Sequence, residues 1–195
     1  MNSSFISRKD KIIVAAIEII SESGLAALST RSLAAKENMS ESLIYKYFGG
    51  LNEVLVGVVS FFVKFDRSIM DTISAKSTKT TSKIRDFFDA YATYYDNYRE
   101  ITTIILNYEE LLHNSGTREM ITNCITERTE FLINVIREGI EKKEIKDIFG
   151  AEELANILIS IMNGAILNRR VMHHEMSFKT EVMQSVNKML RLLEV

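Results

Sequence analysis

The sequence predicts an all-α protein, and three observations lead to this prediction. The 195 residues include no proline and only eight glycines, so little in the chain would interrupt a helix. Hydrophobic residues make up 46% of the chain, which is enough for a packed interior. They recur at steps of three and four, the spacing of one face of an α-helix. We expect about nine helices: an N-terminal three-helix domain (1–50) and a larger C-terminal helical bundle (51–195).

Composition also narrows the class of protein. The formal net charge of −2 excludes a strongly basic overall field, although a local basic patch would suffice for binding DNA. The single cysteine, Cys124, excludes an intrachain disulfide framework and suits the reducing cytoplasm. Residues 1–11 lack a signal-peptide core, and the apolar stretch 54–63 is far shorter than the roughly 20 residues of a membrane span. We therefore expect a cytoplasmic protein with no membrane partner.

The first predicted helix has one apolar face, and a glycine follows it. Gly24 would supply a left-handed helix cap. Ser29 or Thr30 would then cap a second helix over 31–38, because serine and threonine side chains accept bonds from free amides at a helix start. The apolar face of the first helix consists of Ile12, Ile13, Ala16, Ile19 and Ile20.

A third short helix follows after a tight turn. Asn38 ends the second helix and tolerates a left-handed backbone, and Ser40 caps the third helix over about 41–48. Two short helices joined in this way form a helix-turn-helix, whose second helix enters the major groove of DNA. Ile44 and Phe48 are four residues apart and would both pack inward.

This register turns polar side chains outward, towards solvent or towards DNA. Hydroxyl and ammonium groups near the start of a recognition helix reach base edges and phosphates. The outward set is Arg31, Glu41, Ser42, Tyr45 and Lys46. In an arbitrary helical protein such residues form a solvated face, and the basic start of the first helix (Arg8, Lys9 and Lys11) is equally compatible with a solvated terminus.

The segment STRSLAAKENMSESLIYKYFGGLNEVL (29–55) resembles the DNA-binding signature of tetracycline-repressor-like (TetR) regulators. KIIVAAIEIISESGLAALS (11–29) matches the first helix of that family and its glycine. The resemblance covers about residues 8–56. It implies DNA contacts from the matching positions, which are Thr30, Arg31, Glu41, Ser42, Leu43, Tyr45, Lys46 and Tyr47.

Three positions depart from the pattern that the resemblance implies. Asn38 stands where glycine is usual, and Leu51 stands where a phosphate-binding lysine is common. Glu41 places a negative charge where a polar donor is usual, and it would repel phosphate unless it accepted a bond from a cytosine amino group.

The C-terminal bundle is predicted to contain helices over about 51–75, 100–114, 117–143, 151–173 and 177–193. A further helix, capped by the linker 76–82, would place its apolar stripe between Ile84 and Tyr98. Its many aromatic side chains suit either a solid core or a cavity for a small apolar or aromatic effector, which the resemblance also implies. The candidate pocket residues are Phe61, Phe62, Phe65, Phe87, Phe88, Tyr91, Tyr95, Tyr108, His113 and Cys124.

The last two predicted helices have wide apolar faces. Paired with the same helices of a second chain, they would close a four-helix interface with two-fold symmetry, although the faces could also be buried within the chain's own body. The candidate interface residues are Leu154, Leu158, Ile161, Met162, Ala165, Ile166, Val182, Val186 and Met189. A dimer would present paired recognition helices to a palindromic operator in double-stranded DNA.

No catalytic, metal or cofactor signature accompanies these features. His173 and His174 are adjacent, so on a helix they point about 100° apart and could not chelate a metal on one face. There is no glycine-rich phosphate loop and no Ser/His/Asp motif. The sequence therefore predicts a homodimeric, ligand-responsive DNA-binding repressor without enzymatic activity. The alternative, suggested by Leu51 and Glu41, is a helical ligand-binding or adaptor protein that has lost specific operator binding.

Overall fold

The computed structural model describes residues 7–172 and 177–195, and across these ranges the chain is helical, with no strand. The all-α prediction is therefore confirmed. His173 and His174 lie outside the described residues. The helices are α1 (Arg8–Ser23), α2 (Thr30–Lys36), α3 (Glu41–Tyr47), α4 (Leu51–Val63), α5 (Asp66–Ser74), α6 (Thr80–Asn97), α7 (Thr103–Leu106), α8 (Tyr108–His113), α9 (Arg118–Glu141), α10 (Ala151–Val171) and α11 (Phe178–Leu193), with short 3₁₀ turns at Leu25–Ala27 and Arg99–Thr102.

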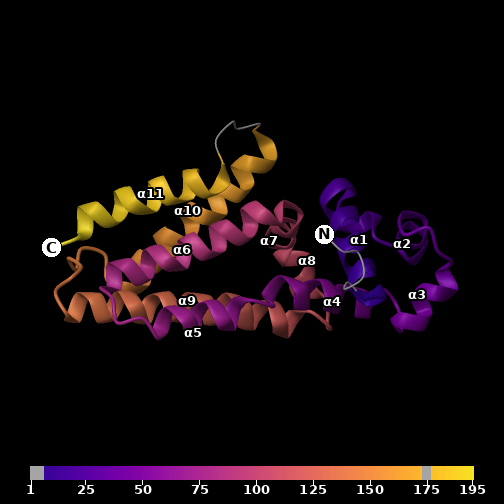
Figure 1. Cartoon of the computed structure of the whole chain (residues 1–195), viewed down its shortest axis with the longest axis horizontal. Coiled ribbons are helices and arrows are strands. Elements are labelled where there is room, and N and C mark those ends of the chain that lie inside the picture. Colours follow the sequence, from indigo (N-terminus) through magenta and orange to yellow (C-terminus); the bar gives the residue numbers. More distant parts are fainter. Residues whose placement is uncertain (1–6, 173–176) are drawn as a thin grey trace. The chain divides into compact units, whose positions relative to one another are not determined.

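The helices form two compact units. One unit combines the chain up to Lys64 with Glu100–Asn123, and the other combines Phe65–Arg99 with Cys124–Val195. The first unit therefore holds α1–α4, α7, α8 and the start of α9 (Figure 1). The second unit holds α5, α6, most of α9, α10 and α11. The division into a DNA-binding domain (1–50) and a ligand-binding and dimerisation domain (51–195) concerns function and stays a prediction.

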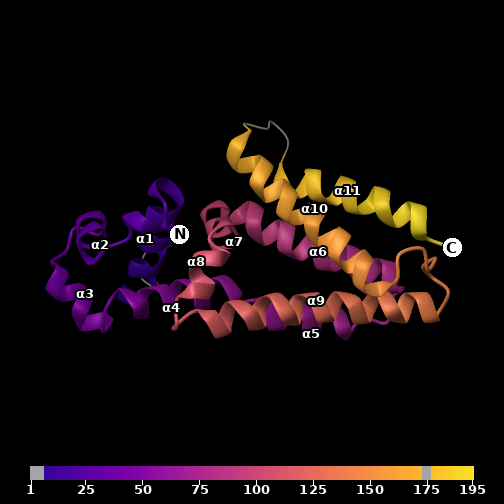
Figure 2. The same ribbon diagram turned by 180° about the vertical axis from the view of Figure 1, so that it is seen from behind.

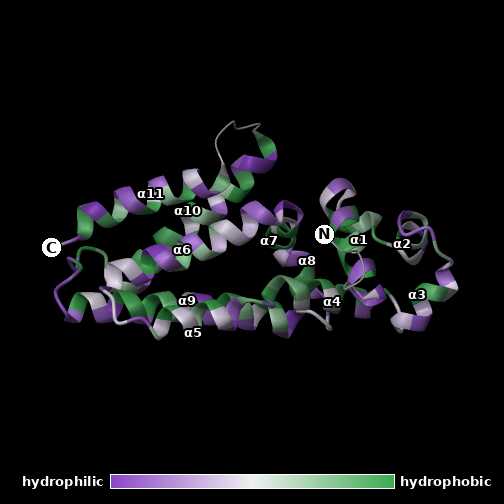
Figure 3. Cartoon of the chain, viewed as in Figure 1, coloured by the Kyte–Doolittle hydropathy of each residue, from purple (hydrophilic) through white to green (hydrophobic). Residues whose placement is uncertain are grey.

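In the first unit, α1 is the central helix and packs against α4, α2 and α3. Hydrophobic residues are concentrated in α1 and α4 (Figure 3). Gly24 ends α1 with φ +85° and donates its amide to the Ile20 carbonyl at 2.9 Å. A positive φ costs glycine nothing, so the chain can turn sharply here and bring α2 back towards α1. Ile12, Ala16, Leu33 and Ile44 are completely buried.

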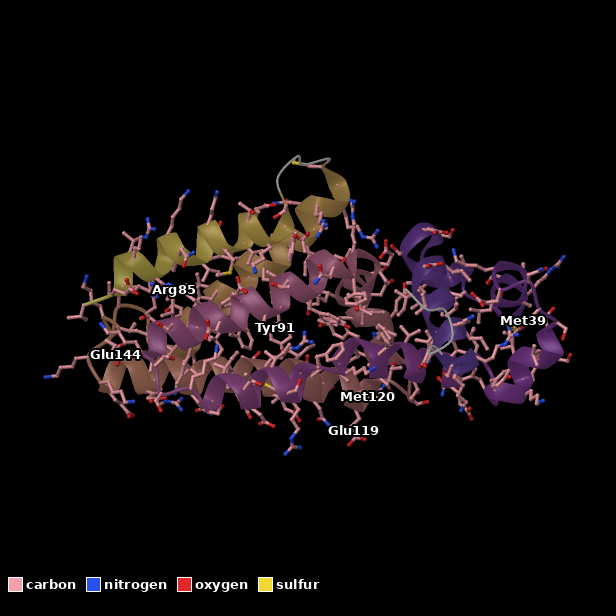
Figure 4. The ribbon with its side chains drawn as sticks, in the orientation of Figure 1. Met39, Arg85, Tyr91, Glu119, Met120 and Glu144 are labelled. Atoms are coloured by element: carbon pink, nitrogen blue, oxygen red, sulfur yellow. The ribbon has the colours of Figure 1, made fainter. Side chains whose placement is uncertain are left out.

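In the second unit, α6 packs against α11 and α5, and α10 packs against α11 (Figure 2). The interior side of α6 is aromatic: Phe87, Phe88, Tyr91 and Tyr95 are all at most 1% exposed. Polar contacts join the start of α6 to other segments of the unit. Glu144, in the segment after α9, accepts hydrogen bonds from the amide and hydroxyl of Thr80, both at 2.6 Å (Figure 4).

Two predicted helices are interrupted, so their predicted extents were wrong. The expected helix over 51–75 breaks at Lys64 and Phe65, which lets the carboxylate of Asp66 enter the interior of the second unit. The expected helix over 100–114 breaks at Asn107, whose side-chain amide donates to the Thr103 carbonyl at 2.7 Å. A side-chain amide that occupies a helical carbonyl competes with the backbone bond and favours a turn.

Within the ranges that the structure covers, no single helix is long and apolar enough to cross a membrane. Only the bent pair Glu41–Tyr47 and Leu51–Ser74 reaches that length and composition, with a 60° bend between its two parts.

Candidate nucleic-acid interface

The helix-turn-helix begins with a capping box at Ser29. The Ser32 amide donates to the Ser29 hydroxyl at 3.0 Å, and the Ser29 amide donates to the Ser32 hydroxyl oxygen at 2.9 Å. This reciprocal pair satisfies amides at the helix start that would otherwise lack partners. The box places Thr30 and Arg31 in the first turn of α2, with Leu33 and Ala34 buried on the opposite side.

The turn between α2 and α3 depends on Asn38. Its φ of +51° confirms the predicted left-handed conformation, which asparagine tolerates better than most residues. The Met39 amide donates to the Ala34 carbonyl at 2.9 Å and closes the turn (Figure 4). Ser40 is the N-cap residue of α3, as expected, but its side chain makes no capping bond, because its hydroxyl pairs with that of Ser42 at 2.8 Å.

The inner side of α3 is held by apolar contacts, and a salt bridge joins the neighbouring helices α1 and α2. Ile44 is completely buried and Phe48 is 6% exposed. The Lys9 ammonium lies over the Phe48 ring, 5.4 Å from its centroid, so the start of α1 covers the end of α3. Lys36 of α2 pairs with Glu18 of α1 at 3.0 Å, and this contact raises the pKa of Lys36 above its ordinary value.

The outer side of the motif is polar and basic. Tyr45 is 56% exposed, and Arg31, Ser42 and Lys46 are also exposed. Neither Arg31 nor Lys46 pairs with a carboxylate anywhere in the described chain, so both cations are available to an external anion. The predicted candidates Leu43 and Tyr47 are half-buried on the flanks of α3.

Glu41 has a partner that the sequence did not reveal. Its carboxylate oxygen Oε2 accepts a hydrogen bond from the Thr30 hydroxyl at 2.6 Å, linking the first turns of α2 and α3. Both residues belong to the predicted DNA-contact set, and Thr30 is half-buried while Glu41 is exposed. The hydroxyl of Thr30 is therefore already committed to a residue of its own chain.

The remaining candidates lie at the ends of neighbouring helices. Arg8 and Lys9 are exposed in the first turn of α1, whose N-cap Ser7 forms a capping box with Asp10, and Lys11 is half-buried. Leu51 is the first residue of α4 and is half-buried, so the position carries no charge for a phosphate.

The second unit contains a buried ionic cluster that the sequence reading missed. Arg128 donates from Nε and Nη2 to the two carboxylate oxygens of Asp66, at 2.8 and 2.7 Å, and from Nη1 to the Tyr95 hydroxyl at 2.9 Å. The Tyr91 hydroxyl donates to Asp66 at 3.2 Å, and the guanidinium carbon lies 4.5 Å from the Tyr91 ring centroid. One signal was present: Arg128 lies four residues after Cys124, on the apolar stripe of its helix, where a charge needs a buried partner.

The predicted pocket residues are divided between the two units. In the first unit, Phe62 is buried against Tyr108 with their ring centroids 6.2 Å apart, and His113 is exposed at the end of α8. In the second unit, the Cys124 thiol lies 3.4 Å from Asp66, and burial raises its pKa to about 12, so the thiol stays protonated. The other candidates are Phe61 in the first unit and Phe65, Phe87, Phe88, Tyr91 and Tyr95 in the second.

The predicted dimer residues lie mostly inside their own unit. Ile161 and Met189 are the half-exposed members of the set. The members that are at most 5% exposed are Leu154, Leu158, Met162, Ala165, Ile166, Val182 and Val186. Apolar side chains that do reach solvent on α10 and α11 include Leu167 and Leu192, at 53% and 70% exposure. The set therefore stays a prediction for the dimer interface.

The described residues contain no group of three or more His, Cys, Asp or Glu side chains that could hold a metal ion.

Comparison with known proteins agrees with this geometry. Residues 12–57 match the family model described as "Bacterial regulatory proteins, tetR family". The chain is 26% identical over 144 residues to the "Probable HTH-type transcriptional regulator YttP" of Bacillus subtilis, covering 71% of this chain and 68% of that protein.

Solved structures share the whole fold. The ketosteroid transcriptional regulator KstR2 of Mycobacterium tuberculosis superposes with a TM-score of 0.84 at 14% identity, covering 97% of this chain and 96% of that chain. The transcriptional regulator FadR of Bacillus subtilis, in complex with stearoyl-CoA, superposes with a TM-score of 0.74 at 18% identity, covering 92% and 96%. These proteins are transcriptional regulators rather than enzymes. Taken together, the matches show that residues 12–57 carry the segment typical of bacterial regulatory proteins of the tetR family, and that the chain as a whole has the fold of solved transcriptional regulators.

Proposed function

We propose that this protein is a ligand-responsive repressor that binds a palindromic DNA operator as a homodimer. The observation that carries the proposal is the outer side of α2 and α3, where Arg31 and Lys46 are exposed beside Tyr45 and have no carboxylate partner among the described residues. Exposed cations on the two helices of a helix-turn-helix neutralise phosphates, and polar side chains beside them on the recognition helix reach base edges. The proposed site of action is the bacterial cytoplasm, where the operator is found.

The proposed dimer matches the two-fold symmetry of the proposed palindromic operator. Two copies of α3 about one helical turn of DNA apart would read the two halves of a palindrome. Helices α10 and α11 are the proposed contact surface, with Ile161 and Met189 half-exposed and Leu167 and Leu192 exposed.

The proposed effector is a small apolar or aromatic molecule. Support comes from the aromatic interior of α6 and from the structure of FadR, which is a complex with stearoyl-CoA. Such a molecule alters operator affinity only if it binds the two conformational states with different affinities. Mass spectrometry of the protein and of its organic extract would identify a copurified molecule, and adding that molecule back should lower operator affinity. An unchanged affinity would contradict the effector role.

Operator binding is tested with a fluorescence-anisotropy titration against the protein's own promoter region and a scrambled duplex. Two salt concentrations, about 0.05 M and about 0.2 M, separate phosphate contacts from other contributions. Wild type should prefer the promoter, and Tyr45→Ala with Lys46→Ala should abolish the preference.

The matched control is Tyr98→Ala with Arg67→Ala. Tyr98 is 51% exposed, close to the 56% of Tyr45, and the Arg67 side chain is 93% exposed. Both control residues lie outside the helix-turn-helix, so their removal should leave the preference intact. If wild type and both double variants bind equally weakly and without preference, the repressor proposal fails. A helical ligand-binding or adaptor protein, the reading that Leu51 favours, would then be the better description.

A further inference from the structure

We infer that Glu41 reads the exocyclic amino group of a cytosine in the operator, and that Thr30 is a positioning residue that holds the Glu41 carboxylate in place. The inference rests on the proposed function and deepens it, because it assigns a base to one residue of the interface. The two side chains have different roles: Glu41 contacts the base, and Thr30 orients the Glu41 carboxylate.

The geometry that carries the inference is the hydrogen bond from the Thr30 hydroxyl to Glu41 Oε2, at 2.6 Å. It ties the carboxylate to α2 and leaves the second oxygen, Oε1, without a partner in the described chain. Glu41 is the first residue of α3 and is exposed. Tyr45 lies four residues later, on the same face of the helix, and is 56% exposed. The free oxygen therefore belongs to the outward face of the helix-turn-helix.

A carboxylate in this position needs an explanation, because it is negatively charged, as the phosphates of DNA are, and the two repel each other. Beside a phosphate it would weaken binding to every sequence. No cation in the described chain neutralises it: Lys36 pairs with Glu18 and Glu22, and neither Arg31 nor Lys46 pairs with it. The Thr30 bond holds the carboxylate in one conformation, which matters for a group that must meet a particular donor. An ionised carboxylate on this face is favourable only where the DNA presents a hydrogen-bond donor.

The major groove restricts that donor to a few atoms. A carboxylate only accepts hydrogen bonds, and guanine presents two acceptors, N7 and O6, while thymine presents O4 and a methyl group. Adenine presents an amino group at N6 beside the acceptor N7, which would repel the second oxygen. Cytosine presents the N4 amino group as its one polar feature there. The carboxylate of Glu41 is therefore complementary to cytosine and mismatched with the other three bases.

The first experiment selects binding sites from random DNA with wild type, Glu41→Gln and Glu119→Gln. Wild type should require cytosine at one position of each half-site, with the other bases about 5- to 150-fold weaker. Glutamine keeps an acceptor for Thr30 but adds a donor, and a glutamine amide pairs with adenine N6 and N7. Glu41→Gln should therefore shift that position from cytosine to adenine and leave the other positions unchanged.

Glu119→Gln is the matched control, since Glu119 is also an exposed glutamate in the first turn of a helix of the same unit (Figure 4). It loses the same charge and should keep the wild-type base preference.

The second experiment tests the positioning role. Thr30→Val removes the hydroxyl with little change in shape, and it should reduce the preference for cytosine by roughly 2- to 12-fold, the range of one lost hydrogen bond. Thr30→Ser keeps the hydroxyl and should restore the preference. Thr72→Val is the control for loss of an exposed threonine hydroxyl in the other unit. Thermal unfolding of each variant gives a second readout. If the Thr30–Glu41 bond only stabilised the packing of α2 against α3, Thr30→Val would lower stability and leave the base preference unchanged.

The outcomes separate this inference from the proposed function. If wild type selects a sequence and Glu41→Gln selects the same sequence, the inference is overturned and the proposed function stands. If Glu41→Gln strengthens binding to all duplexes equally, Glu41 is only an unfavourable charge, and the inference is again overturned. If wild type selects no sequence, both the proposed function and the inference fail.

Discussion

Arg31 and Lys46 of the first unit are exposed and have no carboxylate partner in the described chain, whereas the Arg128 side chain of the second unit is 9% exposed and binds both oxygens of Asp66. The exposed cations and the buried cation therefore differ in what they contribute to folding. The exposed pair contributes little to folding and remains free to bind an anion. Arg128 is desolvated, so removing its partner would leave a buried charge that destabilises the whole unit.

The difference teaches where function can be sought in a helical regulator. A charge that its own chain already neutralises, such as Arg128, holds helices together. A charge such as that of Lys46, exposed on α3 with no carboxylate partner among the described residues, is available to bind an external anion. Glu41 is an intermediate case: its charge has no cation partner among the described residues, yet one of its oxygens accepts the hydrogen bond from Thr30. Four predictions test this comparison, from the largest expected effect to the smallest.

Breaking the buried pair should have the largest effect on stability. Arg128→Met leaves the Asp66 carboxylate buried without its cation, and it should lower the free energy of unfolding by about 3–5 kcal/mol. Replacing both residues, with Asp66→Leu and Arg128→Met, should recover most of that loss, because an apolar pair of similar volume carries no desolvated charge. Urea denaturation measures both values. A single variant as stable as wild type would contradict the assignment of the pair to the fold.

Removing the buried anchor of α3 should have the next largest effect. Ile44 is completely buried, and Ile44→Ala should lower the free energy of unfolding by about 2–5 kcal/mol through lost burial and a cavity. Tyr45→Ala, one residue away but exposed, should change it by no more than about 0.5 kcal/mol. Both variants should lose operator affinity, which an anisotropy titration would show. Equal losses of stability in the two variants would contradict the division of α3 into a buried side that stabilises the fold and an exposed side that does not.

Acid should remove a smaller contribution at the start of α6. Hydrogen bonds from Thr80 lower the pKa of Glu144 below its ordinary value. The resulting stabilisation is complete above the ordinary glutamate pKa, about 4.3, and is lost as the pH falls through the lower folded-state pKa. Glu144→Gln should therefore be less stable than wild type at pH 7 by at most about 1 kcal/mol. The difference should shrink below about pH 4, as thermal unfolding across pH would show.

Removing an exposed cation should leave stability almost unchanged. Lys46→Ala should alter the free energy of unfolding by less than about 0.5 kcal/mol. It should still reduce the slope of log affinity against log salt by about 0.9 for each Lys46 that contacts a phosphate. Arg67→Ala, at an exposed position outside the motif, is the control and should leave the slope unchanged. A slope that does not differ between the two variants would place Lys46 away from the DNA.

Local features of the first unit could be predicted because neighbouring residues determine them. The N-cap at Ser29, one of the two residues expected to cap this helix, the left-handed Asn38 and the inward Ile44 and Phe48 depend on caps, turn chemistry and helical spacing. The Thr30–Glu41 bond was not predicted, although both residues were chosen for the interface, because it depends on how α2 packs beside α3.

Features of the second unit escaped prediction where distant residues determine them. The break after Val63 allows Asp66 to reach Arg128, which lies 62 residues further along the chain. The spacing of apolar residues over 51–75 could not indicate a partner so distant in sequence. The apolar faces of α10 and α11 suited either a second chain or the chain's own body, and Leu158 and Val186 are completely buried within the chain.

The sequence by itself determined the helical class, the capped helix-turn-helix and the polar residues that it presents, because these follow from spacing and side-chain chemistry within one or two turns. Only the tertiary structure decided which charged side chains are paired inside the fold and which remain available to a partner. Whether Arg128, Glu41 or Lys46 has a partner depends on groups that folding brings within hydrogen-bond distance. Electrostatic pairing acts through space, and the order of residues along the chain does not specify that distance.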